Sequence, residues 1–382
     1  MTRLATPPHR RTVREIETVQ LLLEQGRNLR NLAIQNLDLS SLAVVWNELD
    51  VADTLFLGCT FPPGAGEVLQ RNGAILFPKF SNRPYDPYRS GLYDADELNE
   101  EIEWNGRRAT RDELIYDWYV EGGKYAPDVG EALAQRVHDA SIDDALGDLI
   151  GETAQQRLDR RIVGIMGGHS QKRTSPAYLL AAHTAFLLAQ DHLVITGGGP
   201  GIMEAGNVGA FMSKHGADAL DEALELLGSA PDPSDGGYHQ SARDVRQKYP
   251  DGTFNLSVPT WFYGFEPSNL FATKIAKYFA NSIREDGLLA ISLAGIVFAD
   301  GSAGTVQEIF MDAAQNRYAT FDYVSPMVLL GKDRWAPKPG SGIYATLREE
   351  GKLYADRLCV SDSAEEVVEF IRTHPPRPPT PV

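Results

Sequence analysis

Apolar runs and helical patterns alternate along the second half of the chain. RIVGIMGG (161–168), HLVITGGGPG (192–201) and AGIVFADGSAGT (294–305) are short, apolar and end in glycine turns. Each is followed by a segment with apolar residues at i, i+3 and i+4, which is typical of helices. Strands separated by helices long enough to cross over predict an α/β fold with a doubly wound parallel sheet, that is, a Rossmann-like nucleotide-binding domain.

The same pattern gives the expected elements of this domain. The expected strands are 161–168, 192–201, 253–259, 294–305 and 325–331. The expected helices are 175–190, 202–216, 269–285, 306–318, and two more near 341–350 and 363–373. Residues 218–251 begin as an acidic helix and continue as a Pro- and Gly-containing stretch, so we expect a flexible insertion there. That insertion is either a lid over the ligand or a surface segment without function.

The first 155 residues follow a different pattern and predict an N-terminal mixed α/β extension. Short apolar runs at 54–61 and 73–80 are expected strands, 12–26 has helical spacing, and 128–159 is a charged helical connection. No internal repeat is visible. The expected organisation is therefore an N-terminal region at 1–155, a Rossmann-like domain at 156–373, and a disordered Pro-rich tail at 374–382.

Composition narrows the class of protein. The chain has 382 residues, of which 43% are hydrophobic, and a formal net charge of −16. A large core is possible, whereas the negative charge argues against a broad nucleic-acid or membrane surface, which needs a basic face. No apolar run approaches the roughly 18 residues of a membrane span, and no signal peptide is readable. Cys59 and Cys359 form no zinc or disulfide framework, so we expect a cytoplasmic protein in which both are buried.

Three glycine turns carry the candidate chemistry. They are GIMGGHSQKR (164–173), GGGPGIME (197–204) and DGSAGTVQE (300–308), each between an expected strand and helix. Exposed main-chain N–H groups at a helix N-terminus form an anion site, so phosphate is the expected occupant. The dinucleotide fingerprint and the Walker phosphate loop are both absent. The alternative is that any one of these turns is only a tight strand–helix connection.

The ligand-binding candidates come from these turns and the helices that follow them. They are Gly167, Gly168, His169, Ser170, Arg173, Gly197, Gly198, Gly199, Gly201, Met203, Glu204, Asn207, Gly301, Ser302, Gly304 and Thr305. His169, Ser170, Lys172 and Arg173 form a cluster of donors for phosphate or base. Glu204 has a second interpretation, because an acidic residue in a first helical turn interacts favourably with the helix dipole.

Two interpretations of Glu308 remain open from spacing alone. Thr305 and Glu308 fit a capping box, in which the glutamate only closes on the first amide of the helix. The same carboxylate, at the end of the glycine turn 300–308, can instead face a ligand. Spacing alone favours the capping box.

The pair of turns GGGPGIM (197–203) and DGSAGTVQE (300–308) resembles the two hallmark turns, GGGxxGLM and PGGxGTxxE, of the Lonely Guy (LOG) family. That family and its relatives, the pyrimidine/purine nucleotide 5′-monophosphate nucleosidases, are often labelled lysine decarboxylases. The resemblance covers about residues 161–330. It implies hydrolysis of the N-glycosidic bond of a nucleoside 5′-monophosphate, which gives free base and ribose 5-phosphate.

The resemblance assigns roles to Glu308 and Arg284. A carboxylate beside the ribose stabilises oxocarbenium-like charge and orients or deprotonates the attacking water. The resemblance gives this role to Glu308 and so reverses the preference for the capping box. It also places an arginine on the helix before the second hallmark turn, where Arg284 stands. The alternative for Arg284 is a solvated helix-end residue beside Glu285 and Asp286.

This chain departs from the family pattern at two places. Asp300 replaces the hallmark proline, and its carboxylate would repel a nearby phosphate unless it points away. The second arginine of many relatives has no counterpart, since Leu289, Ala290 and Ile291 occupy that neighbourhood. The pocket is therefore an active site in which Asp300 points away, or one that is weakened or inactive.

Two function hypotheses follow. The first is a phosphoribohydrolase acting on a nucleoside 5′-monophosphate, AMP-like or N6-modified AMP. The second is a nucleotide-binding sensor or carrier with weak or no catalysis. A pyridoxal-phosphate decarboxylase has no supporting lysine, so no cofactor is expected, and no metal-binding spacing is present. The resemblance also implies a homo-oligomer, a dimer or larger.

Overall fold

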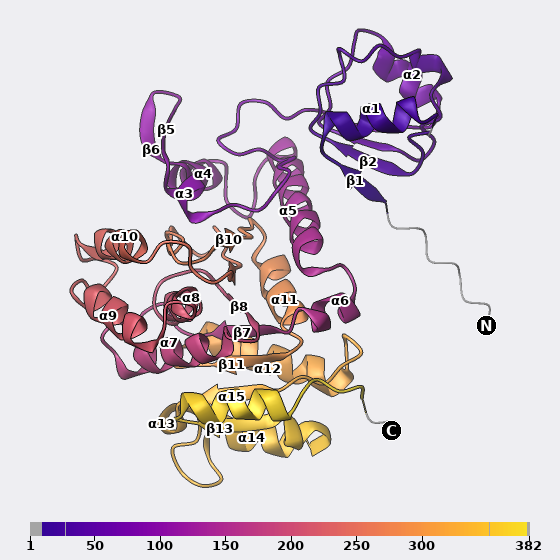
Figure 1. Cartoon of the computed structure of the whole chain (residues 1–382). Helices are drawn as coiled ribbons and strands as arrows, with labels where there is room; N and C mark the ends of the chain where they lie inside the picture. Colours follow the sequence, from indigo (N-terminus) through magenta and orange to yellow (C-terminus); the bar gives the residue numbers. More distant parts are fainter. Residues whose placement is uncertain (1–9, 27, 351, 380–382) are drawn as a thin grey trace. The chain divides into compact units, whose positions relative to one another are not determined.

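The computed structural model describes residues 10–26, 28–350 and 352–379, which divide into two compact units (Figure 1). Unit 1 comprises residues 1–91 and 128–141, and unit 2 comprises 92–127 and 142–382. Residues 1–9, for which the sequence predicts no signal peptide, and the last tail residues, 380–382, lie outside the described residues.

Unit 2 is built on a seven-stranded parallel sheet with the order β10-β9-β8-β7-β11-β12-β13. Its strands are β7 (Ile162–Met166), β8 (Leu193–Thr196), β9 (Leu256–Ser257), β10 (Lys274–Ile275), β11 (Gly295–Phe298), β12 (Met327–Leu330) and β13 (Leu358–Ser361). The strands β7, β8, β11 and β12 are almost entirely buried, as expected where helices cover both faces of a parallel sheet. The expected doubly wound α/β fold is confirmed.

Helices cover both faces of this sheet. One group contains α7 (Pro176–Leu188), α8 (Ile202–Met212) and α15 (Ala364–Thr373), which pack together. The strands β7 and β11 are neighbours, but the chain continues from β7 to β8 on one side and from β11 to β12 on the other. A crevice forms at the carboxyl ends of two strands where the connections diverge in this way, so the fold itself offers a ligand site after β7 and β11.

The expected helix at 269–285 is wrong over most of its length. Residues Lys274–Ile275 form the edge strand β10, and the helix α11 begins only at Asn281 and ends at Ile291. The side chains of Phe271, Ile275 and Phe279 are all buried. A segment that is apolar on every side satisfies a helical pattern by chance, and here tertiary packing decides for strand and loop.

The expected flexible insertion is instead folded onto unit 2 as two helices, α9 (Ala217–Gly228) and α10 (Tyr238–Lys248). Arg173 holds them in place: its guanidinium donates to the main-chain oxygens of Ala230 and Tyr238 and to Ser241. It also forms a buried ion pair with Glu204 at 2.6 Å. The residues 218–251 are therefore a docked pair of helices.

The remaining helices of unit 2 include α12 (Ala303–Tyr318), which follows β11, and several shorter ones. The shorter ones are α3 (Ala95–Asn99), α4 (Arg111–Glu121), α6 (Ala154–Asp159), α13 (Lys332–Trp335), α14 (Gly342–Glu350) and the 3-10 helix η2 (Lys352–Arg357). A hairpin, β5 (Glu101–Trp104) with β6 (Arg107–Thr110), precedes α4. The long helix α5 (Val129–Ile150) runs from unit 1 into unit 2.

Residues 92–127 belong to the same compact unit as the large sheet, which differs from an N-terminal region ending at 155. Tyr93 pairs with Ile275 through main-chain hydrogen bonds of 3.0 and 2.8 Å. Asp112 on α4 accepts from the Trp261 indole N–H at 2.8 Å and lies 2.8 Å from Lys277 Nζ. All three side chains of this cluster are buried.

Unit 1 contains a four-stranded parallel sheet in sequence order. Its elements are β1 (Arg11–Val13), α1 (Ile16–Glu24), β2 (Leu32–Gln35), the 3-10 helix η1 (Trp46–Glu48), β3 (Leu55–Leu57), α2 (Ala65–Arg71) and β4 (Ile75–Phe77). Ala33 pairs with Leu55 and Leu55 with Ile75, so successive coils of about 20 residues stack as in a solenoid. This structural repeat is not visible as a repeat of residues.

Two further expectations concern the tail and the cysteines. Arg377 exchanges main-chain hydrogen bonds of 2.8 and 3.1 Å with Val324, so the tail is ordered at that point. Cys59 and Cys359 are partly buried free thiols, and burial raises the pKa of each.

Within the described residues, no helix is both long enough and apolar enough to span a bilayer.

Candidate functional site

The three glycine turns meet at the carboxyl ends of β7, β8 and β11. Gly168 in the first turn donates its main-chain N–H to the oxygen of Asp300 in the third, at 2.9 Å. Its carbonyl accepts from the N–H of Ile202, at the start of α8, at 3.1 Å. One residue thus ties all three turns together, which the spacing of the glycines alone did not indicate.

Two glycines of the second turn are required by packing between the turns. Gly201 has φ +69°, and a Cβ there would overlap the carbonyl oxygen of Gly168. Gly198 has φ +78° and lies against the side chain of Ser257. An L-residue with a side chain rarely adopts either conformation. The backbone conformation therefore requires glycine at these two positions, while the ligand candidates Gly197 and Gly199 of the same turn line the cavity.

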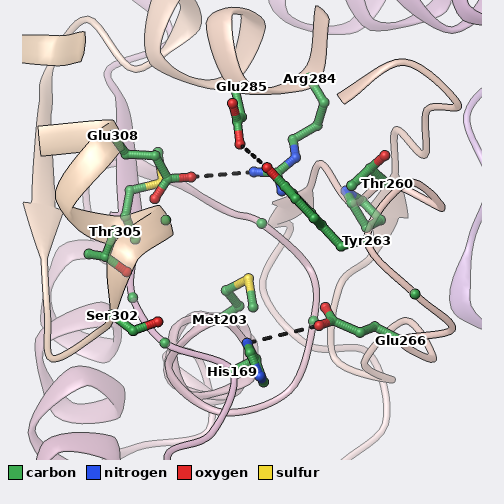
Figure 2. Close-up of a pocket in the computed structure, with 18 residues that line it drawn as sticks. His169, Met203, Thr260, Tyr263, Glu266, Arg284, Glu285, Ser302, Thr305 and Glu308 are labelled. Atoms are coloured by element: carbon green, nitrogen blue, oxygen red, sulfur yellow. Dashed lines mark hydrogen bonds and ion pairs between the residues drawn. The ribbon is translucent and has the colours of Figure 1, made fainter. Parts of the chain in front are cut away.

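A cavity of ≈ 420 Å³ opens where the turns meet (Figure 2). The candidates that line it are Gly167, Gly168, His169, Gly197, Gly199, Met203, Arg284, Ser302, Gly304, Thr305 and Glu308. The cavity lies entirely within unit 2 and has the size of a small-molecule site.

The capping-box interpretation of Glu308 is wrong. The helix α12 begins at Ala303 with Ser302 as its N-cap, so Thr305 already lies inside the first turn. Glu308 lies in the second turn, where its carboxylate lines the cavity and accepts a hydrogen bond from Arg284 Nη1 at 3.3 Å. Because Ser302 makes no side-chain cap, the first-turn amides of α12 are available to an anion at this edge of the cavity.

Arg284 and Glu308 form a mostly buried pair, with side-chain exposures of 11% and 13%. Burial raises the pKa of Glu308 to about 7, the Arg284 cation opposes this rise, and the neighbouring Glu285 carboxylate adds to it. Glu308 therefore changes protonation state near neutral pH. The interpretation of Arg284 as a solvated helix-end residue is wrong, since this helix face is covered.

Arg284 also retains unused hydrogen-bonding capacity. Its Nε is buried and has no partner among the described residues, and the hydrogen bond from its Nη1 to Glu308 is long. A guanidinium carries five N–H donors in a planar fork. A buried arginine at a cavity wall with unsatisfied donors favours an oxygen-rich ligand in that cavity.

Several cavity residues were not expected from the sequence: Met166, Pro259, Thr260, Tyr263, Gly264, Glu266 and Glu285. Most of them lie in the loop that follows β9. That loop also leaves the carboxyl end of a strand, so the rule for open parallel sheets would have indicated it even without a glycine turn. Glu285 directly follows Arg284, and its side chain lines the same wall.

Other candidates lie outside the cavity: Ser170, Arg173, Gly198, Gly201, Glu204, Asn207 and Gly301. Arg173 is fully occupied by Glu204 and by the docked helices, so it is a structural residue and not a phosphate donor. Glu204 also accepts hydrogen bonds from Tyr178 and Tyr238, at 3.0 and 2.8 Å. These contacts explain the presence of a glutamate at this position better than the helix dipole does. Ser170 is exposed.

Asn207 and Gly301 also have structural partners. The Asn207 amide donates to Asn255 at 2.8 Å and accepts from Thr196 at 2.7 Å, so it ties α8 to the strands below. The carbonyl of Gly301 accepts from the Arg334 guanidinium at 2.9 Å. Their polar groups are used within the fold.

Asp300 is held by residues that lie outside the cavity. Gln171 donates to one carboxylate oxygen at 2.7 Å, and Arg334 lies 3.3 Å from the other. Asp300 itself is not a cavity residue. Its negative charge is therefore partly neutralised by Arg334 and lies outside the cavity lining, as expected if Asp300 points away from a ligand.

His169 lies at the opposite side of the cavity from Arg284 and near Glu266, with 3.9 Å between Nδ1 and Oε1 (Figure 2). Its side chain is 63% exposed, so it is a rim residue. Among the described residues, no group of three or more His, Cys, Asp or Glu is placed to hold a metal ion.

Comparison with known proteins yields matches only among solved structures. No family model matches the chain, and no curated protein matches it. The molybdenum cofactor binding protein of the phototrophic bacterium Rippkaea orientalis is similar at 14% identity and a TM-score of 0.35, over 56% of this chain and 95% of that one. The Moco carrier protein of Chlamydomonas reinhardtii is similar at 16% identity and a TM-score of 0.35, over 56% and 95%. Likenesses at this level do not identify a function for this chain.

Proposed function

We propose that the cavity binds a nucleoside 5′-monophosphate and that this chain is a nucleotide-binding carrier or sensor. One observation carries the proposal: three glycine turns, linked through Gly168, converge on a cavity walled by the buried Arg284 with unused donors. The phosphate fits the uncapped first turn of α12 beside Ser302 and Thr305, and Arg284 donates to oxygen atoms of the ligand.

Binding is tested by calorimetric titration with a panel of nucleoside 5′-monophosphates and ribose 5-phosphate. The Arg284→Lys variant keeps the charge but loses the planar fork, so we expect the affinity to fall by about 10-fold. Arg348→Lys, on the exposed face of α14, is the matched control and should bind like the wild type. Equal affinity of all three proteins would contradict the assignment of Arg284 to the ligand.

A second candidate function is hydrolysis of the N-glycosidic bond of the bound monophosphate. The observation that favours it is Glu308, a buried carboxyl whose pKa is raised to about 7 at the cavity wall. A general base works best when its pKa is near the operating pH. In this mechanism ionised Glu308 orients the attacking water, takes its proton and stabilises the positive charge that develops on the ribose as the C1′–N bond breaks, while Arg284 keeps the carboxylate in place. The released base takes up a proton from solvent water, and Glu308 then returns its own proton to solvent.

The two functions are separated by incubating each monophosphate, including an N6-prenylated AMP, with wild type, Glu308→Gln and the exposed control Glu349→Gln. If the chain is a hydrolase, free base and ribose 5-phosphate are released by the wild type and the control, and Glu308→Gln slows release by at least about 100-fold. The rate should rise as pH increases through about 7, because the base must be ionised. Binding without release by any protein would leave the carrier or sensor function.

The resemblance to LOG proteins also implies a homo-oligomer. Light scattering of the full chain tests this prediction independently of ligand binding.

A further inference from the structure

Glu285 is a buried carboxylate that faces the cavity from the helix α11. The residue is only 7% exposed, yet it is part of the cavity wall. Its two oxygens accept hydrogen bonds from Tyr263 Oη at 3.1 Å and from Gln307 Nε2 at 3.0 Å. Both of these partners are neutral, so they do not compensate the charge.

The carboxylate therefore has acceptor capacity to spare. An ionised carboxyl offers about four lone-pair positions, and the two contacts above use two of them. A buried charge with an incomplete set of donors is costly, and a ligand that supplies N–H groups relieves that cost. A ligand that presents a carbonyl oxygen at the same place instead meets acceptor against acceptor.

Tyr263 adds a flat surface beside this carboxylate. Its hydroxyl donates to Glu285 and accepts from Asn281 Nδ2 at 3.0 Å, so two hydrogen bonds hold the ring at its hydroxyl end although the residue is 61% exposed. Figure 2 shows Tyr263, Glu285 and Arg284 together at one side of the cavity, away from His169 and Glu266. An aromatic face next to an acceptor fits a planar heterocycle that carries N–H donors.

We propose that Glu285 is the specificity-determining residue of this cavity and selects amino-bearing bases over their oxo counterparts. The inference rests on the proposed nucleotide-binding function. It predicts that the amino-bearing member binds more tightly for the base class that the cavity accepts, CMP over UMP or AMP over IMP. The exocyclic amino group donates to the carboxylate, whereas the carbonyl oxygen of the counterpart opposes it; the adjacent ring nitrogen also differs, being an acceptor in CMP and AMP and an N–H group in UMP and IMP.

The experiment measures dissociation constants of the full chain for these four monophosphates and for ribose 5-phosphate. We expect at least one amino-bearing ligand to be favoured over its oxo counterpart by about 10-fold or more, the scale of a hydrogen bond to a charged group. In Glu285→Gln, which keeps the size but can donate as well as accept, the preference should shrink to less than about 3-fold. Asp286→Asn, which removes a neighbouring exposed charge, should retain it.

The Tyr263→Phe variant tests whether Glu285 selects the base directly or only holds the Tyr263 ring in position. This variant keeps the ring and frees one acceptor position on Glu285, so the amino preference should persist. Loss of the preference to the same degree in Tyr263→Phe and Glu285→Gln would overturn the inference. So would equal affinity of wild type for the members of both pairs, with the nucleotide-binding function still supported. Failure of all monophosphates and ribose 5-phosphate to bind would instead overturn the proposed function itself.

Discussion

Two largely buried arginines of unit 2, Arg173 and Arg284, differ in how completely the fold satisfies their hydrogen-bond donors. Arg173 and Glu204 are both 1% exposed and are joined by two hydrogen bonds. Their pairing stabilises the fold and leaves no free donor of Arg173 for a ligand. Arg284 is slightly more exposed and keeps free donors at a cavity wall. A buried charge with complete partners is structural, while one with unsatisfied groups beside a cavity is available for binding.

Asp312 is a further buried carboxyl, one turn beyond Glu308 on α12. It is 3% exposed, its Oδ2 has no partner among the described residues, and burial raises its pKa to about 8. Asp312 is therefore predominantly protonated at neutral pH in the folded protein and ionised in the unfolded chain. Glu308 contributes in the same direction, with a pKa of about 7.

These two carboxyls predict a loss of stability as pH rises. The folded state binds more protons than the unfolded state between about pH 4 and 8, so the free energy of unfolding falls across that window. Asp312 alone accounts for several kcal/mol, because a tenfold change in a proton-binding constant is worth about 1.4 kcal/mol. Denaturant unfolding at pH 5 and pH 9 should show a smaller difference in Asp312→Asn than in the wild type or in the exposed control Asp333→Asn. Parallel pH profiles for all three would contradict the prediction.

At the scale of elements, close packing of α7 on α8 fixes the direction in which α8 presents its N-terminus. Gly209 of α8 lies against the main chain of α7, and a Cβ there would overlap the Ala182 carbonyl oxygen. The helix α11, which carries Arg284 and Glu285, has a glycine too, but Gly287 faces open space. Gly209 thus permits the close contact between α8 and α7, whereas Gly287 makes no such contact and only increases the backbone entropy that α11 loses on folding.

This contrast predicts opposite effects of one substitution. Gly209→Ala should destabilise the protein by about 1–3 kcal/mol or more, because the helices must separate to accommodate the methyl group. Gly287→Ala should stabilise it by roughly 0.5–1 kcal/mol, because alanine loses less backbone entropy in a helix. Thermal and denaturant unfolding of both variants provide the check, and a similar loss of stability in the two would show that packing against Ala182 is unimportant.

At the scale of the whole molecule, residues distant in sequence form the cavity wall. Asp112 of α4 holds both ends of the segment 261–268, through the indole N–H of Trp261 and the main-chain N–H of Ser268. Lys277 adds hydrogen bonds to Ser268 Oγ at 3.2 Å and to the Glu266 carbonyl at 3.3 Å. The cavity residues Tyr263, Gly264 and Glu266 lie between these anchors.

A double-mutant cycle on Asp112 and Lys277 tests this anchoring. Each of Asp112→Asn and Lys277→Met should destabilise the chain by about 3–5 kcal/mol, because each leaves a buried charge unpaired. The double variant should lose clearly less than the sum, since no unpaired charge remains. Additive losses measured by denaturant unfolding would mean that the two charges do not stabilise one another.

The fold of unit 2 and much of the cavity could be predicted from the sequence because both depend on local signals. Strands such as Ile162–Met166 are continuous apolar runs, and glycine turns mark their carboxyl ends. Gly168 and Thr305 were predicted as ligand-binding residues in this way, whereas Glu308 was assigned to the ligand only by the family resemblance, because spacing alone favoured a capping box. The sequence could not show that Arg173 and Glu204 face the fold instead, because polar residues next to a glycine turn look the same whether their partners are ligands or distant side chains.

The alternation of strands and helices follows from the residue pattern alone, and with it the parallel sheet and the edge at which its turns lie. Contacts between distant residues were needed to establish that Lys274–Ile275 is a strand, that α9 and α10 dock on Arg173, and that residues 92–127 belong with the large sheet. The tertiary structure also places Glu285 and Tyr263 beside Arg284. Periodicity encodes which face of an element is buried, whereas the identity of the partner depends on contacts between distant residues, such as Lys277 and Asp112, which lie 165 positions apart.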